Sequence, residues 1–213
     1  ANGIMYTGAE PYFIDVDKST LGMSPAALKT FFADVDMIDG EAMYKPTGQR
    51  VSAIVPMHTF GFPCEIEEIV SLANEYNITV VEDSAESLGS FKNEKHTGTF
   101  GKLGIFSFNG NKTVTCGGGG MIITDDDKLA EMIKHLSTQA KMPHKWDYRH
   151  DFVGYNYRCP NINAAIGCAQ MENIEAYIMN KRETSALYAS FFEDLDIEYV
   201  QEPNGCKSNY WLN

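Results

Sequence analysis

The sequence of 213 residues has no excess of positive charge. It contains 17 Lys and Arg residues against 29 Asp and Glu residues, which gives a net charge of −12. Nucleic acids and anionic membrane surfaces attract proteins that carry a basic face. The charge balance therefore argues against both as partners.

Cysteine pairs and long apolar runs are also missing. The five cysteines form no CxxC pair, and their number is odd: Cys64, Cys116, Cys159, Cys168 and Cys206. Such a set indicates reduced thiols in a cytoplasmic protein and predicts neither a disulfide framework nor a metal site. No apolar run approaches the ~20 residues that a membrane-spanning helix needs.

Short apolar segments instead alternate with amphipathic ones. The pattern predicts strands over 12–16, 51–55, 78–81, 104–108, 121–124 and 197–200, and helices over 26–32, 65–76, 125–137 and from 161 to about 192. Compact strand–helix–strand connections join parallel strands. We therefore expect an α/β fold with a mainly parallel sheet flanked by helices.

Polar residues follow three of the expected strands. His58 and Thr59 follow the strand 51–55, Asp83 follows 78–82, and Lys112 lies just past 104–108, before the glycine run 117–120. Ligands collect at the carboxyl ends of parallel strands, although an exposed rim of loops could also produce this set of residues. Pyridoxal phosphate (PLP) enzymes need a lysine that forms a Schiff base and an acid that keeps the pyridine nitrogen protonated. Lys112 and Asp83 together therefore indicate a PLP site.

An ordered series of motifs makes this indication more specific. The series comprises residues 8–17, 58–61, 82–89, 98–101, 106–112, 117–120, 154–158, 163–167 and Gln170. In these motifs the chain resembles the sugar aminotransferases of the DegT/DnrJ/EryC1/StrS family, a branch of the fold-type I PLP enzymes. The resemblance implies the large PLP-binding α/β domain of an aspartate-aminotransferase-like enzyme.

The resemblance also implies roles for individual residues around the cofactor. Lys112 corresponds to the Schiff-base lysine, and Asp83 to the acid that contacts the pyridine nitrogen. Ala85 would lie against one face of the ring, and Ser107 would bind the phosphate. Glu86 stands where many family members have Gln, near the ring hydroxyl.

Further residues are implied at the rim of the site. Asn156 resembles the asparagine that reaches the phosphate of the neighbouring subunit, which implies a homodimer with shared sites. His58 and Thr59 are candidates for contacts with substrate or cofactor. Tyr155 and Arg158 are candidates for binding an acidic substrate group such as a nucleotide diphosphate.

The activity that the resemblance implies is transfer of an amino group, from L-glutamate, to a nucleotide-linked keto-sugar in cell-surface glycan biosynthesis. Residues 86–90 and 209–213 most resemble the subgroup that aminates UDP-linked 4-keto-6-deoxy-N-acetylhexosamine at C4. One alternative is a PLP-dependent sugar dehydratase, in which histidine replaces the Schiff-base lysine, so Lys112 argues against it. Another is a non-catalytic PLP-binding or regulatory relative, which would be expected to lose Lys112 or Asp83.

From the resemblance, we expect the chain to be part of a longer protein. Relatives have an N-terminal Gly-Thr/Ser segment that holds the phosphate and an aromatic residue that stacks on the ring, and neither precedes Ala1. We expect residues 1–160 to form part of the large domain. Residues 161–213 are expected to form a long helix that leads into a truncated small C-terminal domain.

Overall fold

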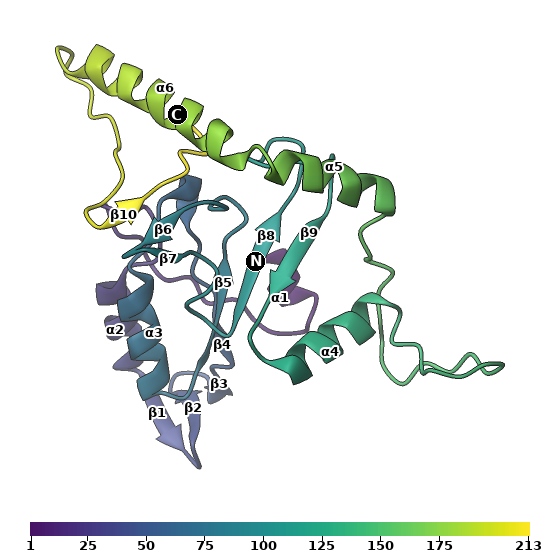
Figure 1. Cartoon of the computed structure of the whole chain (residues 1–213). Coiled ribbons are helices and arrows are strands. Elements are labelled where there is room, and N and C mark those ends of the chain that lie inside the picture. Colours follow the sequence, from purple (N-terminus) through teal and green to yellow (C-terminus); the bar gives the residue numbers. More distant parts are fainter.

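The computed structural model describes residues 1–213, in which helices and strands follow one another mostly in short runs (Figure 1). The helices are α1 (Asn2–Met5), α2 (Pro25–Phe32), the 3-10 helix η1 (Thr59–Gly61), α3 (Ile66–Glu75), α4 (Asp127–Ser137), α5 (Asn161–Met171) and α6 (Ile174–Phe192). The strands are β1 (Val35–Ile38), β2 (Glu41–Tyr44), β3 (Gln49–Arg50), β4 (Ala53–Ile54), β5 (Thr79–Asp83), β6 (Phe91–Lys92), β7 (Lys95–His96), β8 (Leu103–Ser107), β9 (Gly120–Ile123) and β10 (Cys206–Lys207).

The central sheet has the strand order β4-β5-β8-β9. β4 pairs parallel with β5, and β5 pairs parallel with β8. β9 runs antiparallel to β8, so the sheet is mixed. The α/β fold was predicted from the sequence, and three of the four central strands have the expected parallel direction.

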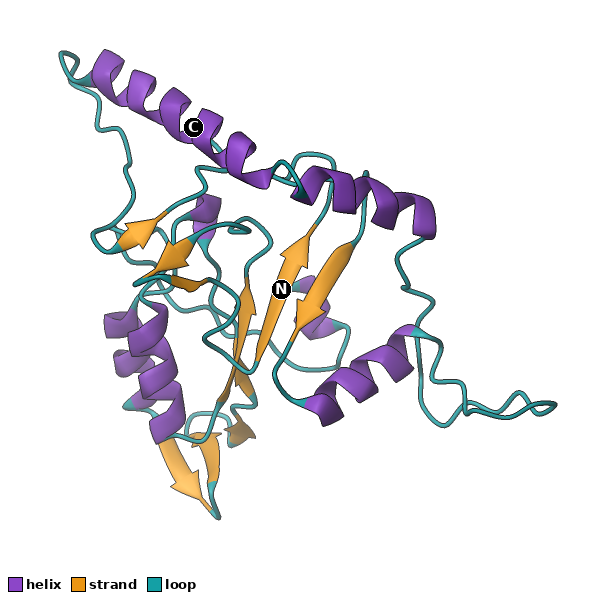
Figure 2. Cartoon of the chain, viewed as in Figure 1, coloured by secondary structure: helices purple, strands orange, loops and turns teal.

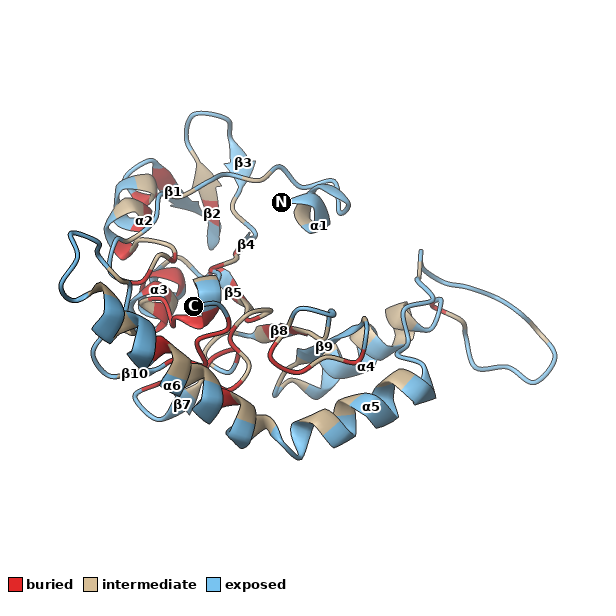
Figure 3. Cartoon of the chain, turned by 90° about the horizontal axis from the view of Figure 1, so that it is seen from above, coloured by how far each residue is buried: buried red, intermediate tan, exposed pale blue.

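The main core lies between α2, α3 and the β4–β5 side of the central sheet. It includes Leu28 and Phe32 of α2, Ile66 and Ile69 of α3, and Val80 of β5. Full burial of each such side chain stabilises the fold by about 1.5–3 kcal/mol. Figure 3 shows the buried residues gathered around α3 and β5, whereas α4 and α5 are mostly exposed or intermediate. No residue of α4 or α5 is buried.

Local sequence signals account for the two core helices. The Ser24 side chain accepts a hydrogen bond from the Ala27 N–H at 3.3 Å, and Pro25 occupies the first helical position, so both start α2 as expected. Asn77 ends the turn after α3 with φ +53°, a left-handed conformation that asparagine tolerates better than most residues. Both helices therefore begin and end close to their expected positions.

Two small antiparallel sheets accompany the central one (Figure 2). One has the order β1-β2-β3 and the other β10-β6-β7. Since β10 pairs with β6, residues close to the C-terminus return to the body that contains the central sheet. None of the helices combines the length and the apolar character needed to cross a membrane.

Three sequence expectations need correction. Residues 12–16 form no strand, and their only bridge pairs Val16 with Met23. Residues 197–200 form no strand, and the only strand after α6 is β10. The long helix expected from 161 is divided into α5 and α6, which run nearly end to end in Figure 1. The expected domain division at residue 160 stays a prediction.

Candidate active site

The carboxyl ends of β4, β5 and β8 lie at one edge of the central sheet, because these strands run parallel. β5 ends at Asp83 and β8 ends at Ser107. The first residue of the antiparallel strand β9, Gly120, pairs with Ser107. This edge therefore collects Asp83, Ser107 and the glycine run 117–120, and open α/β sheets bind ligands at such an edge.

Asp83 presents a partly free carboxylate at this edge. The residue is half-buried, and its Oδ1 accepts a hydrogen bond from the Ala85 N–H at 3.1 Å. The contact holds Ala85 close to the end of β5 in a local turn of the kind that aspartate favours. The second oxygen, Oδ2, accepts no hydrogen bond from the protein and is left for a ligand donor.

Glu82, the residue before Asp83, is fully buried and bonded at both carboxylate oxygens. Oε2 accepts hydrogen bonds from His58 Nε2 at 3.0 Å and from a backbone N–H at 2.7 Å, and Oε1 accepts two backbone N–H groups at 2.6 Å. The three backbone donors are Gly98, Phe100 and Gly101. Burial acts to raise the pKa of Glu82, but the hydrogen bonds from His58 and from these N–H groups outweigh it and lower the pKa. Glu82 is therefore an ionised anchor inside the protein.

His58 was expected to face the open edge of the sheet, but it is buried inside the protein. Its side chain is fully buried; Nε2 donates to Glu82, and Nδ1 accepts the N–H of Cys64 at 3.2 Å. Because both ring nitrogens are used, the geometry places the proton on Nε2 and leaves none for a ligand contact. The expected substrate contact is thus replaced by a structural role in fixing the loop after β4. Thr59, the next residue, is half-buried at the start of η1.

Lys112 lies in the loop between β8 and β9, and its side chain is only 13% exposed. Its Nζ is 3.7 Å from Oε1 of Glu86 and 4.0 Å from the centroid of the Trp211 ring. The other oxygen of Glu86, Oε2, accepts the N–H of Phe60 at 2.7 Å. A carboxylate and an aromatic face both attract a cation, so the amine has a defined place between them.

Space remains open beside the Lys112 loop. Ser107 is half-buried, and its Oγ accepts the Asn109 N–H at 3.3 Å. A side-chain carbon added at Gly110 or Gly118 would meet no atom within 4 Å. The Ser107 hydroxyl and the backbone of this loop are therefore accessible to a ligand.

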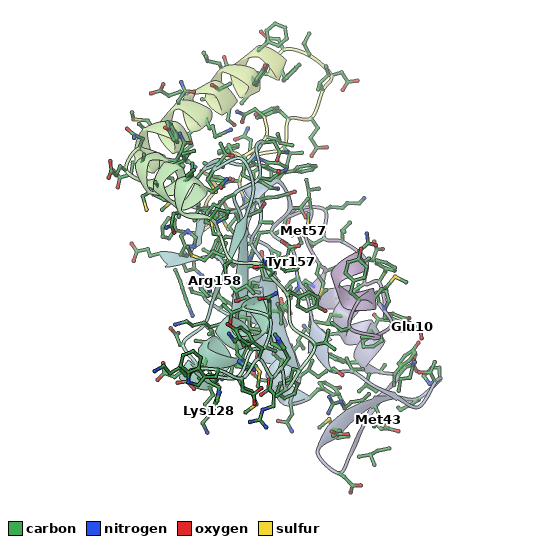
Figure 4. All side chains as sticks on the ribbon, turned by 90° about the vertical axis from the view of Figure 1, so that its right-hand side faces the viewer. Glu10, Met43, Met57, Lys128, Tyr157 and Arg158 are labelled. Carbon is green, nitrogen blue, oxygen red and sulfur yellow. The ribbon has the colours of Figure 1, made fainter.

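The remaining expected residues lie on the segment before α5. Asn156 is exposed and bridges to Thr138 at the end of α4, and the exposed Tyr155 stacks on Tyr157 with ring centroids 5.1 Å apart. Arg158 lines a shallow hollow of about 440 Å³ together with the glycines 118–120. Figure 4 shows Tyr157 and Arg158 well apart from Lys128 in the first turn of α4. The structure thus brings Arg158 near the glycine run but gives Asn156 and Tyr155 no contact with the Lys112 loop.

The sequence predicted no role at the site for individual residues of the C-terminal segment 209–213. Trp211 covers Lys112, and Asn209 is fully buried while its Nδ2 donates to the carbonyl oxygens of Glu86 and Leu88. No short-range pattern links Trp211 to a lysine 99 positions earlier. Glu82 did carry a signal, because a charged residue inside an apolar strand requires buried partners.

The sequence model of the DegT/DnrJ/EryC1/StrS aminotransferase family matches residues 1–213. A GDP-perosamine synthase from Escherichia coli O157:H7 is 38% identical over 211 residues, which are 99% of this chain and 53% of that protein. EpsN from Bacillus subtilis (strain 168), whose name describes a pyridoxal phosphate-dependent aminotransferase, is 38% identical over 213 residues, or 100% of this chain and 52% of that protein.

The fold agrees with a solved structure of the same family. A DegT DnrJ EryC1 StrS aminotransferase from Brucella abortus superposes with a TM-score of 0.88 at 25% identity, over 99% of this chain and 54% of that one. The chain thus spans about half the length of the curated relatives it matches, 53% and 52%. Because the family model covers every residue of it, the chain belongs to the DegT/DnrJ/EryC1/StrS aminotransferase family.

Proposed function

We propose that the protein containing this chain is a PLP-dependent aminotransferase that transfers an amino group from L-glutamate to a nucleotide-linked keto-sugar for cell-surface glycan synthesis. The observation that carries the proposal is the placement of Asp83 and the loop of Lys112 at one edge of the central sheet. Family membership gives this pair its expected chemistry.

The residues present fit PLP by the chemistry of their donors. The free Oδ2 of Asp83 can accept a hydrogen bond from a protonated pyridine nitrogen, and Ala85 is held nearby with a side chain small enough to lie against a ring. The accessible Ser107 hydroxyl and the open loop backbone suit a phosphate. When bound, PLP supplies an electron sink for the reacting carbon.

Lys112 and Glu86 would act on protons and on binding. The Lys112 amine would hold the cofactor covalently and, once freed by the amino donor, would move a proton to or from the substrate carbon. Glu86, whose Oε1 is 3.7 Å from that amine, would orient it. Lys112 and Asp83 are both present, which disfavours the dehydratase and the non-catalytic alternatives.

Borohydride reduction followed by peptide mapping tests the attachment in the protein at its natural length. Incubation with PLP and reduction should leave the cofactor on the Lys112 peptide, and prior addition of L-glutamate should remove it, because amino transfer releases the lysine. The Lys112→Met protein should form no adduct, and its rate of amino transfer should fall by at least about 10²–10⁴-fold. Lys102→Met is the matched control, since Lys102 lies on the surface paired with Asp126 at 2.7 Å. An adduct of equal yield in Lys112→Met would refute the proposal.

For the acceptor, we propose a UDP-linked 4-keto-6-deoxy-N-acetylhexosamine. The name of the E. coli relative indicates a GDP-linked sugar for that protein, which makes GDP the main rival. Incubating the pyridoxamine phosphate form with UDP-, GDP- and dTDP-linked keto-sugars separates them by product mass. Amination of the GDP- or dTDP-linked sugars alone would defeat the UDP assignment.

We further propose a cytoplasmic homodimer in which Asn156 of one subunit reaches the phosphate in the other. The exposed position of Asn156 and the free cysteines support this arrangement. Mixing Asn156→Ala with Lys112→Met subunits tests it, because half of the randomly mixed dimers would be hybrids with one intact site. About a quarter of wild-type activity should return on mixing. No recovery despite proven subunit exchange would exclude a shared site.

A further inference from the structure

Trp211 occupies a fixed place against the amine of Lys112. The residue is only 7% exposed, and the ring centroid is 4.0 Å from Lys112 Nζ. Glu86 is the other partner of that amine, and one of its carboxylate oxygens already accepts a hydrogen bond from the Phe60 N–H. The amine therefore has one carboxylate oxygen and one indole face as its close partners.

Every polar group of Trp211 is bonded to the protein. Its indole Nε1 donates to the carbonyl oxygen of Asn111 at 2.6 Å, and its backbone N–H donates to Asn209 Oδ1 at 2.9 Å. Its carbonyl oxygen accepts Lys181 Nζ of α6 at 2.9 Å. These three anchors leave the ring little freedom to turn away from Lys112.

The backbone that presents the indole is in an uncommon conformation. Tyr210, the residue before Trp211, has φ +46°, and Phe60, whose ring stacks near Trp211 with centroids 6.5 Å apart, has φ +56°. Bulky residues rarely adopt a left-handed conformation, and such residues concentrate at functional sites, where the surrounding structure holds them. One of the two precedes Trp211 in the chain, and the other stacks near its ring.

We propose that Trp211 is a positioning residue: its ring face holds the Lys112 amine against Glu86 while the amine is not bonded to the cofactor. The inference rests on the proposed function of Lys112 and adds a residue to it. A held amine returns to one place after each release, so proton movement at the substrate carbon starts from one geometry.

The aromatic face, not the indole N–H, is the element that acts. Trp211→Phe keeps a ring face and loses the bond to Asn111, whereas Trp211→Leu keeps apolar bulk and loses the face. Trp146→Phe is the matched control, because Trp146 is 78% exposed and has its own lysine, Lys145, with Nζ 4.9 Å from the ring centroid. The control variant touches neither Lys112 nor Glu86.

Labelling of the cofactor-free protein gives a readout that does not depend on activity. An amine-selective reagent, followed by peptide mapping, should modify Lys112 about three- to tenfold faster in Trp211→Leu than in the wild type. Trp211→Phe and Trp146→Phe should stay within about twofold. Equal acceleration in the Phe and Leu variants would overturn the ring-face role, and so would no acceleration in either.

Kinetics and fluorescence complete the test. In the holoenzyme, Trp211→Leu should lower kcat by about three- to tenfold with the KM for the amino donor unchanged, and Trp211→Phe should restore kcat. If Trp211→Leu does not fold, a Trp146→Phe background leaves Trp211 as the sole tryptophan among residues 1–213, and any tryptophan outside them is common to the two proteins compared. Lys112→Met should then change its emission, and an unchanged emission would overturn the contact.

The two proposals fail in distinguishable ways. If no cofactor attaches to Lys112, the proposed function fails, while labelling and fluorescence still report the contact between Lys112 and Trp211. If the cofactor attaches normally but the Leu variant shows wild-type labelling and kcat, only the positioning role fails.

Discussion

Replacing Glu82 by Gln measures how strongly the fold depends on the buried carboxylate beside Asp83. The two carboxylate oxygens of Glu82 accept four hydrogen bonds, two at each oxygen. Gln keeps one oxygen but places an NH₂ group where the other oxygen was. The two buried donors that were bonded to that oxygen then face a donor and lose their acceptor. Each buried donor left unsatisfied costs about 1–3 kcal/mol, which predicts a loss of about 2–6 kcal/mol in the free energy of unfolding.

Urea denaturation of the two proteins provides the assay, with the shift in midpoint converted at constant m-value. Glu68→Gln is the control, because Glu68 pairs with Lys29 at the surface and its side chain is 47% exposed. That variant should lose only about 0–1 kcal/mol. A Glu82→Gln protein as stable as Glu68→Gln would refute the claim that the carboxylate anchors this part of the fold.

The same carboxylate predicts a direction for the pH dependence of stability. Burial raises the pKa of Glu82, but the hydrogen bond from His58 and the backbone N–H groups bring it below its ordinary value of 4.5. Because the pKa is lower in the folded state, ionised Glu82 stabilises the fold in full above about pH 4.5. This stabilisation is lost as the pH falls through the lowered pKa. The stability gap between wild type and Glu82→Gln should therefore narrow on acidification below that pH, and a gap that widens would contradict the assignment.

Three further outcomes follow from other parts of the chain. Burial raises the pKa of the Cys64 thiol, so a thiol reagent followed by mass spectrometry should label the exposed Cys159 in the folded protein and Cys64 only after unfolding; early labelling of Cys64 would contradict its burial. Arg182 donates two bonds of 2.7 Å to Glu202, and Arg182→Met should speed hydrogen exchange in residues 202–211, with a local loss of about 1–2 kcal/mol because both side chains are partly exposed. Ser24→Ala should cost about 1 kcal/mol through loss of the α2 N-cap, measured by urea denaturation, whereas no loss would show that the 3.3 Å contact contributes nothing.

The parts of the fold that were predicted correctly have strong local signals. Helix α2 follows from Ser24 and Pro25, and α3 from its apolar spacing. The hairpin of β1 and β2 also has a local signal in the sequence. Ile38 pairs with Glu41, so Asp39 and Gly40 form a two-residue turn, and both have positive φ as Asp-Gly hairpin turns do.

Other features had no signal within reach of a local pattern. The turn between β6 and β7 uses Asn93 and Glu94, both with positive φ, and glutamate is not a typical residue for that position. Residues 12–16 have a strand-like composition, but a strand forms only where a partner supplies hydrogen bonds. The contact of Trp211 with Lys112 depends on the return of the chain through β10, which only the tertiary structure determines.

His58 shows why residue type and position were insufficient at the site. A histidine after a parallel strand at the ligand-binding edge is a candidate for a ligand contact, and the sequence left this role and a structural role in the loop equally open. The decisive fact is the residue that faces it: Glu82 needs buried donors, and His58 Nε2 supplies one of four. Once Nδ1 accepts the Cys64 N–H as well, the ring has no capacity left for a ligand.

The alternation of side chains along β5 connects this buried anchor to the proposed chemistry. Successive residues of a strand point to opposite faces, so Glu82 and Asp83 cannot face the same side. Glu82 is held on its side by four hydrogen bonds, which directs Asp83 to the other with one oxygen free. The orientation of the proposed cofactor-binding aspartate is therefore determined by a neighbour that would touch neither cofactor nor substrate. A change at Glu82 should accordingly weaken PLP binding even where the protein stays folded, whereas a change at the exposed Glu68 should not.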